Sequence, residues 1–414
     1  MHPFTWLFLL ALAAATAVKL WLALRHMQHV RANRDQVPAE FAAEIPLSSH
    51  RTAADYTVAK GRVDLAEIPF DALVVLVLTL GGGLAFLDAQ VRPLLGDGLL
   101  HGVALIGLVL VITSALSLPA TLYRTFVIEQ RFGFNKMTLR MFITDMLRTT
   151  LLGTALGLPL LAAVLWLMGE MGSLWWLYVW GVWVAFNLTV LAIYPTFIAP
   201  LFNKFSPLED HALEARVRTL LDRCGFQAQG LFVMDGSRRS SHGNAYFTGL
   251  GRSKRIVFFD TLLSRLTADE IEAVLAHELG HFKLRHVFKR IVWTFAASLV
   301  FLALLAWLAA QPWFYSALGV DYPSTAMALL LFFTVLPSFT FLLSPAFAWY
   351  SRRHEFEADH YAADHAQAAD LVRALVKLYK DNASTLTPDP VHSMFYDSHP
   401  PASIRIARLQ AAAR

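Results

Sequence analysis

The sequence has little of two things that soluble enzymes usually contain, cysteine and charge. Cys224 is the only cysteine among 414 residues, so neither a disulfide framework nor a cysteine-built zinc site can form. Charged residues make up 16% of the chain, below the usual quarter, while hydrophobic residues make up 56%. This composition excludes an ordinary soluble enzyme and indicates a polytopic membrane protein. The net charge of +4 forms no basic stripe, so no nucleic acid is expected as a partner.

Several apolar runs are long enough to cross a bilayer, which takes about 20 residues of helix. The first run lacks a basic start and a small-residue cleavage site, so it is predicted to be an uncleaved span. No chain of Asp, Glu or His crosses these runs, which argues against a transporter or channel. The seven predicted spans are residues 4–24, 70–90, 99–121, 149–169, 173–195, 291–311 and 325–349, and residues 35–67 are predicted to be a linker.

The basic residues between the spans alternate from one side of the membrane to the other. Arg25 and Arg31 follow the first span, and Arg352 and Arg353 follow the last. The loops predicted for the opposite side hold a single basic residue, Arg92. Because basic residues favour the cytoplasmic side, the N-terminus is predicted outside and all long polar loops inside.

A polar insert between the fifth and sixth spans is long enough for a small α+β subdomain. Residues 209–223 are amphipathic, and residues 231–235, 244–249 and 255–260 are typical of short strands. After the last span, a helix is predicted over residues 350–381, then a loop, then a short helix over 402–412. The predicted divisions are residues 1–195 with five spans, 196–290 with the catalytic insert, 291–349 with two spans, and 350–414 as a C-terminal catalytic segment. The predicted fold is a mainly α, seven-span membrane protein with an α+β subdomain on the cytoplasmic side.

Residues 267–290 are predicted to form one helix that carries a metal site. Thr267 and Glu270 form a capping box. His277 and His281 are four residues apart, so both imidazoles leave the same face and can bind one tetrahedral zinc. Glu278 is placed to take a proton from a water at the metal. A pair of histidines on a solvated helix face is the alternative interpretation.

The third ligand must come from farther along the chain. The pattern H-E-x-x-H-x-x-G-x-x-H fails because Leu284 and Val287 stand at its last two positions, and His286 is expected to point elsewhere. Glu355 in the segment SRRHEFEAD is the natural candidate. Asp359 lies four residues later on the same helix face, where it can accept a hydrogen bond from a ligand imidazole. The alternative is an ordinary acidic face balanced by neighbouring arginines.

HELGH (277–281) and SRRHEFEAD (351–359) resemble motifs of the type I CAAX prenyl endopeptidases, membrane-integral zinc metalloproteases of the gluzincin group. The blocks FVIEQRFGFNKMT, IYPTFIAPLFNKFSPL, DGSRRSSHGNAYFTG and MFYDSHPPASIRIARL also resemble that family, in the same order. The resemblance covers residues 55 to 412. It implies one zinc ion per chain, held by His277, His281 and Glu355, with Glu278 as the catalytic base. It also implies that the seven spans enclose a water-filled chamber with the zinc site on its cytoplasmic side.

Further residues are assigned by the same resemblance. Asn244 would contact the substrate or the oxyanion, and His399 would polarise the scissile carbonyl or stabilise the oxyanion. Arg405 would help to hold the acidic residues near zinc. The strand of Ala245, Tyr246, Phe247 and Thr248 would offer its edge to an extended peptide. His242, His286, His354 and His392 are assigned no role in the site.

The function expected from these observations is an integral membrane zinc endopeptidase that acts on CAAX-type, prenylated or other membrane-associated peptides. The expected location is a bacterial inner membrane, or the endoplasmic reticulum of a eukaryote, with the site facing the cytoplasm. A quality-control protease resembling the HtpX family is the nearest alternative, although it has fewer spans. A channel or transporter with structural His and Glu residues is the distant one.

Overall fold

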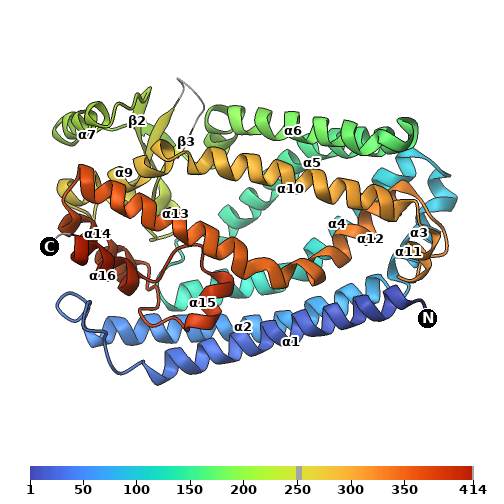
Figure 1. Cartoon of the computed structure of the whole chain (residues 1–414), viewed down its shortest axis with the longest axis horizontal. Helices are drawn as coiled ribbons and strands as arrows, with labels where there is room; N and C mark the ends of the chain where they lie inside the picture. Colours follow the sequence, from blue (N-terminus) through green and yellow to red (C-terminus); the bar gives the residue numbers. More distant parts are fainter. Residues whose placement is uncertain (249–253, 413–414) are drawn as a thin grey trace.

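The computed structural model describes residues 1–248 and 254–412, and most of them are helical (Figure 1). Six helical segments are long and apolar enough to cross a membrane. A bent pair, α2 (Leu47–Leu78) and α3 (Gly83–Leu95), gives the seventh span, with a 50° angle at the break. This confirms the predicted fold class and the count of seven. The other spans are α1 (Pro3–Ala32), α4 (Leu99–Tyr123), α5 (Leu139–Glu170), α6 (Trp175–Ile193), α10 (His286–Ala309), and α12 (Thr325–Thr340) with α13 (Ser344–His365).

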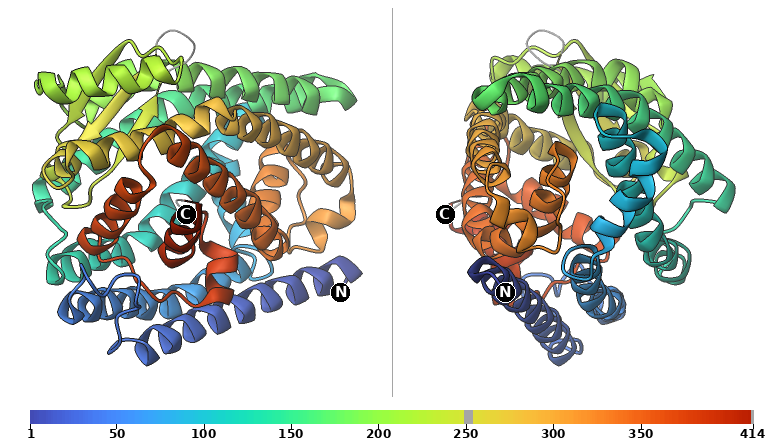
Figure 2. Two further views of the ribbon diagram at one scale, coloured as in Figure 1. Left: turned by 60° about the vertical axis from the view of Figure 1, so that its left-hand side comes forward. Right: turned by 90° about the vertical axis from the view of Figure 1, so that its right-hand side faces the viewer.

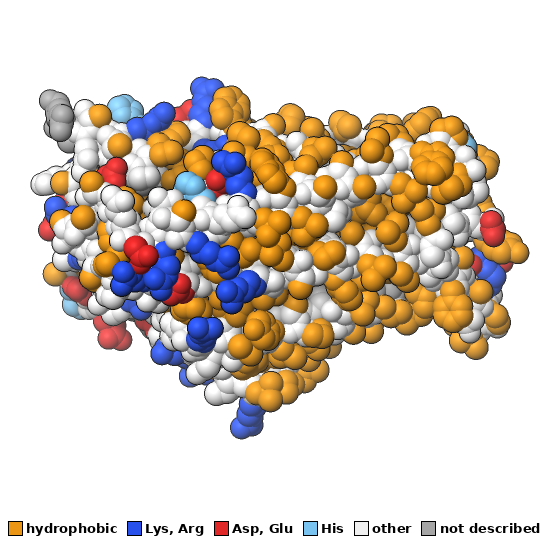
Figure 3. Space-filling view, turned by 90° about the horizontal axis from the view of Figure 1, so that it is seen from below, with side chains coloured by type: hydrophobic (Ala, Val, Ile, Leu, Met, Phe, Trp, Pro, Cys, Tyr) orange, Lys and Arg blue, Asp and Glu red, His pale blue; other side chains and the backbone are white. Residues whose placement is uncertain are grey.

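The long helices are arranged around a common axis (Figure 2). Each contacts the next in the order α2, α1, α12, α10, α6, α5 and α4, and the π-helical turn after α4 (Arg124–Glu129) returns to α2. Large apolar side chains such as Leu110, Leu151 and Trp307 are exposed on these helices. Lipid therefore has to solvate them, as it does in membrane spans. On the face shown in Figure 3, apolar side chains spread over the part away from the sheet, and most charged ones gather toward the end that carries the sheet.

The sheet end is built like a small soluble domain. Four strands are ordered β1 (Phe205–Pro207), β2 (Gly230–Met234), β4 (Arg255–Phe259) and β3 (Ala245–Thr248). Strand β4 runs parallel to β2 and antiparallel to β3. The neighbouring helices are α7 (His211–Arg223), α8 (Asp260–Leu263), α9 (Ala268–Lys283), α14 (Ala368–Asp381) and α16 (Ala402–Ala412). Their apolar faces meet in a core that includes the fully buried Leu220, Phe258, Leu275 and Leu279. Two short helices, α11 (Pro312–Ser316) and α15 (Pro390–Tyr396), complete the chain.

Several predicted segments differ from the structure. Helix α2 begins at Leu47, so the predicted linker 35–67 is mostly helix. Gly61 of α2 lets this helix pack closely on Met27 of α1, and hydropathy does not reveal such a contact. Helix α3 continues to Leu95, into the stretch between the predicted spans 70–90 and 99–121. The predicted C-terminal helix 350–381 is interrupted at Ala366, whose backbone is extended. The predicted loop before residue 402 contains α15, which Asp389 caps by accepting hydrogen bonds from two backbone N–H groups.

The expected helix 267–290 is also two helices. Helix α9 ends at Lys283, and α10 begins at His286 after Arg285, which has a left-handed backbone (φ 59°). Two predicted divisions, at residues 290 and 349, therefore fall inside helices α10 and α13. The last residue of the predicted strand 244–249 lies outside the described residues.

Candidate metal centre

Helix α9 carries the two histidines of the HELGH motif. The capping box predicted for its first turn is present: the Thr267 hydroxyl accepts from the backbone N–H of Glu270, whose carboxylate accepts from the backbone N–H of Thr267. Its apolar face, with Leu275 and Leu279, is buried in the sheet-end core. Rotation about the helix axis is thereby fixed, and the imidazoles point toward α13.

Helix α13 brings the carboxylates to these histidines, and a glycine permits the approach. A Cβ atom added to Gly280 would lie 3.0 Å from the Ala358 Cα and 3.1 Å from the Tyr361 Cβ, closer than side chains normally pack. The glycine of HELGH therefore allows α9 and α13 to cross closely enough for residues of both helices to share one ion.

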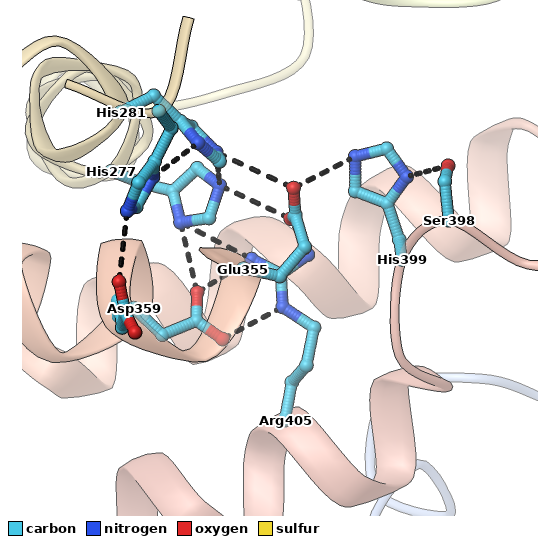
Figure 4. Close-up of polar contacts among 9 residues, drawn as sticks. His277, His281, Glu355, Asp359, Ser398, His399 and Arg405 are labelled. Atoms are coloured by element: carbon cyan, nitrogen blue, oxygen red, sulfur yellow. Dashed lines mark hydrogen bonds and ion pairs between the residues drawn. The ribbon is translucent and has the colours of Figure 1, made fainter. Parts of the chain in front are cut away.

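Three ligand atoms converge at this crossing (Figure 4). The Nε2 atoms of His277 and His281 are 3.3 Å apart. The Glu355 Oε2 lies 3.5 Å from the first of these nitrogens, and its Oε1 lies 3.4 Å from the second. A tetrahedral ion with ligand bonds of about 2.0–2.2 Å separates its donors by roughly 3.4 Å. The Glu355 Oε2 is buried and has no hydrogen-bond partner among the described residues, so this donor set fits a metal ion.

A buried ion pair of Asp359 and Arg405 contacts His277 at the ring nitrogen that faces away from the other donors. The Nδ1 of His277 lies 2.9 Å from the Asp359 Oδ1, and Arg405 binds the same carboxylate through two N–H groups at 2.6 and 2.8 Å. Burial alone would lower the pKa of His277, but hydrogen bonds to Asp359 and Glu355 outweigh it and raise the pKa to about 9. Asp359 and Arg405 thus lie where the sequence analysis expected them.

A pocket of about 510 Å³ opens beside the ligands, and Glu278, Asn244 and His399 all line it. His399 is largely exposed, and its Nε2 lies 3.4 Å from the Glu355 Oε1. The Ser398 hydroxyl lies 3.1 Å from the Nδ1 of His399. If that hydroxyl donates, the Nε2 carries the ring proton and can donate it into the pocket.

The structure brings only part of the predicted peptide-binding strand to this pocket. Ala245 lines the pocket, as does the preceding Asn244. The side-chain oxygen of Asn244 accepts a hydrogen bond from the backbone N–H of Ala245 at 2.8 Å. Tyr246 and Thr248 line a different, smaller pocket, and Phe247 packs against Phe226 and Phe282. Strand β3 is nevertheless an edge strand among the described strands, because it pairs with β4 alone.

Sequence reasoning assigned no role in the site to two residues that lie around the ligands, Arg352 and His286. Arg352 donates hydrogen bonds to the carbonyl oxygens of Ser393 and Asp397, at 3.0 and 2.9 Å, and so ties the segment before His399 to the helix of Glu355. His286 was expected to point away, but its ring contacts His281 and its other nitrogen pairs with Glu357. The signal for Arg352 was its place in the SRRHEFEAD motif, while no sequence signal shows the turn that redirects His286.

Comparison with known proteins agrees with this geometry. The family model described as the CAAX prenyl protease N-terminal region with five membrane helices matches residues 26–204, and the model of peptidase family M48 matches residues 207–413. The chain belongs to peptidase family M48. This membership confirms the prediction of a multi-pass membrane metalloprotease and rules out the channel interpretation.

Known relatives align with most of the length of this M48 protein. A CAAX prenyl protease 1 homolog of Arabidopsis thaliana is 38% identical over 77% of this chain and 77% of that protein. The CAAX prenyl protease 1 of Saccharomyces cerevisiae is 37% identical over 73% of this chain and 71% of its own length. The crystal structure of S. mikatae Ste24p matches with a TM-score of 0.91 at 30% identity, over 99% of both chains. The chain is therefore a metal-dependent endopeptidase that acts on peptides at a membrane.

Proposed function

We propose that this M48 protein is a zinc endopeptidase that cleaves CAAX-type C-termini at the cytoplasmic face of its membrane. The observation that carries the proposal is the convergence of His277, His281 and Glu355 at the spacing a tetrahedral zinc requires. Zinc suits a donor set of two imidazoles and one carboxylate with an open position for water. The relatives' names supply the substrate class, and the match of the membrane part favours them over an HtpX-like quality-control protease.

The chemistry follows from where the side chains lie. A zinc ion held by these ligands would acidify water and polarise the scissile carbonyl. Glu278 faces the same pocket as His277, so it takes the proton of the attacking water and returns it to the leaving amine. The Nε2–H group of His399 donates a hydrogen bond to the oxygen of the scissile carbonyl as negative charge develops on that oxygen.

The substrate is held as an added strand. The free edge of β3 offers backbone hydrogen bonds to an extended peptide, and Asn244 at the start of this strand lies in the pocket with His277. The ring of long helices supports the predicted chamber, from which the peptide would reach this edge.

The decisive experiment compares the full chain with Glu278→Gln. We expect purified wild-type protein to contain one zinc per chain and to cleave a farnesylated CAAX peptide faster than an unfolded membrane protein. Glu278→Gln should keep its zinc and lose about 10²–10⁴-fold in rate, because the general base is gone. Asp269→Asn, an exposed carboxylate of the same helix, is the matched control and should keep full activity. Wild-type rates in Glu278→Gln would refute the mechanism, and preference for the unfolded protein would favour the HtpX-like function.

A labelling experiment tests the orientation. The single native cysteine, Cys224, is buried and should stay unlabelled by a membrane-impermeant maleimide. A cysteine at the exposed Ser237, at the sheet end, should react only from the cytoplasmic side. A cysteine at the exposed Asp97, in the turn between α3 and α4, should react only from the other side. The reverse pattern would contradict the orientation without affecting the metal centre.

A further inference from the structure

The two candidate ligand histidines differ in the partner of Nδ1, the ring nitrogen that faces away from the metal position. A histidine that binds a metal through one nitrogen normally donates the proton of its other nitrogen to a partner, which fixes the ring orientation. For His277 that partner is the Asp359 carboxylate. For His281 no carboxylate of the described residues lies at the second nitrogen; instead, its Nδ1 lies 3.1 Å from the Nδ1 of His286.

His286 continues the contact to a carboxylate. Its Nε2 lies 3.0 Å from the Glu357 Oε2, and the Glu357 Oε1 accepts a hydrogen bond from the Arg353 Nε at 3.0 Å. His286 is 4% exposed, whereas Glu357 is partly exposed at the outer end of the chain of contacts. The path from His281 therefore leads through a buried imidazole to a solvated ion pair.

Only one arrangement of protons satisfies every contact. The Nε2 of His281 faces the metal position, so its Nδ1 must carry the ring proton and donate it to His286. The Nδ1 of His286 must then accept, which leaves the proton of that ring on Nε2. That nitrogen donates to Glu357, which can only accept when ionised.

The chain breaks its helix at the one place that makes this contact possible. On an uninterrupted helix, residue 286 would lie about 140° around the axis from residue 281, and the two rings could not meet. Arg285 adopts a left-handed backbone instead (φ 59°), which is unfavourable for a non-glycine residue by roughly 1–2 kcal/mol. Helix α10 restarts at His286, and the ring returns to His281.

A second metal ion is the competing explanation of this cluster. Ligand atoms of His286, His354 and Glu357 lie within 4.8 Å of one another. However, the rings of His286 and His354 are stacked, with centroids 4.0 Å apart and planes 9° from parallel. The nitrogen lone pairs of stacked rings lie in two nearly parallel planes, so they do not converge on one ion. The stacked ring of His354 instead restrains the plane of His286.

We infer that His286 is a positioning residue of the metal centre, which orients the ligand His281 through a hydrogen-bonded relay that ends on Glu357. This inference rests on the proposed zinc site. His286 contacts neither the substrate nor the ion, so its loss should appear first in how firmly the metal is held.

The test compares His286→Leu with His286→Asn in the full chain. Leucine removes the acceptor, while the asparagine Oδ1 can take the place of the Nδ1. We expect zinc release to an excess of chelator to be about 10–100-fold faster in His286→Leu, and within about threefold of wild type in His286→Asn. His360→Leu, an exposed histidine on α13, is the matched control and should release zinc as wild type does. Cobalt-substituted His286→Leu should also show an altered visible absorption spectrum, which a merely structural role would not produce.

A further variant covers the case that His286→Leu does not fold. Glu357→Leu breaks the relay at its partly exposed end, without a buried cavity, and should accelerate zinc release severalfold while the metal-free protein melts as wild type does. Wild-type release in every folded variant would overturn the relay, as would equal release in His286→Leu and His286→Asn. A wild-type chain that binds no zinc would instead refute the metal centre itself, which distinguishes the two failures.

Discussion

Two clusters of the same composition, each with a buried Asp, a buried His and one Arg, lie at opposite ends of the molecule (Figure 1). Near the sheet, Asp359 bridges Arg405 and His277. At the far end, Asp88 of α3 lies 2.7 Å from the Arg92 Nη2 and 3.1 Å from the Nε2 of His101 of α4. The first cluster holds the ring of a proposed metal ligand, whereas the second lies where α3 and α4 pack against each other.

The difference lies in the nitrogen that faces away from the aspartate. The Nε2 of His277 meets two further donors, those of His281 and Glu355. Among the described residues, only two groups of three or more ligand atoms come together, and His101 belongs to neither. The composition of a cluster therefore does not identify a site; the convergence of free donor atoms does.

The largest effect is expected when the arginine of each cluster is replaced. Arg405→Leu leaves the buried Asp359 without its ionic partner, so we expect unfolding to become easier by about 3–5 kcal/mol. Zinc affinity should fall about 10–100-fold, because the partner of a ligand is disturbed. Arg92→Leu removes a partly exposed partner, so about 1.5–3 kcal/mol should be lost with zinc affinity unchanged. Thermal unfolding in detergent and chelator competition measure both, and equal zinc affinities in the two variants would contradict the comparison.

A smaller effect is expected from a methyl group next to each cluster. Gly280→Ala would place its Cβ against the Ala358 backbone, so α9 and α13 must separate, at a cost of about 1–3 kcal/mol and with weaker zinc binding. Gly102→Ala, beside His101, would meet the Leu165 Cδ1 at 3.1 Å and the Ala326 Cβ at 3.2 Å, but no backbone atom. We expect it to cost about 1 kcal/mol and to leave zinc binding unchanged. The same two measurements apply, and tight zinc binding by Gly280→Ala would show that the close crossing is not required.

The smallest effect is a pH dependence that only the sheet-end cluster should show. The raised pKa of His277, about 9, means that zinc must displace a proton from this ring at neutral pH. The apparent dissociation constant should therefore rise about tenfold for each unit by which the pH falls below 9, or about 1.4 kcal/mol per unit. Chelator competition between pH 6.5 and 8 tests this slope. His101→Asn is the control and should keep the slope of the wild type. A zinc dissociation constant that does not change with pH in the wild type would contradict proton displacement.

The sequence predicts the parts of this site that depend on local spacing. The capping box, the shared helix face of His277 and His281, and the pairing of Glu355 with Asp359 all follow from intervals of three or four residues. The seven spans follow from hydropathy, with the second one bent. In contrast, the role of His286 depends on a left-handed turn at Arg285, which no sequence rule predicts for an arginine. Helix α2 was missed over residues 47–67 because its polar turns pack on α1 rather than on lipid.

Helix α13 links the bilayer to the coordination sphere. It continues a membrane span and carries Glu355 about 17 Å beyond its first residue, Ser344. His277 and His281 belong to α9, which is no part of a membrane span but crosses α13 closely at Gly280. A tilt of α13 by about 2° about Ser344 would move the carboxylate by about 0.6 Å, comparable to the roughly 0.5 Å that a productive site tolerates. Because bilayer thickness influences helix tilt, we expect the distance between the Glu355 carboxylate and the two imidazoles to vary with the thickness of the bilayer.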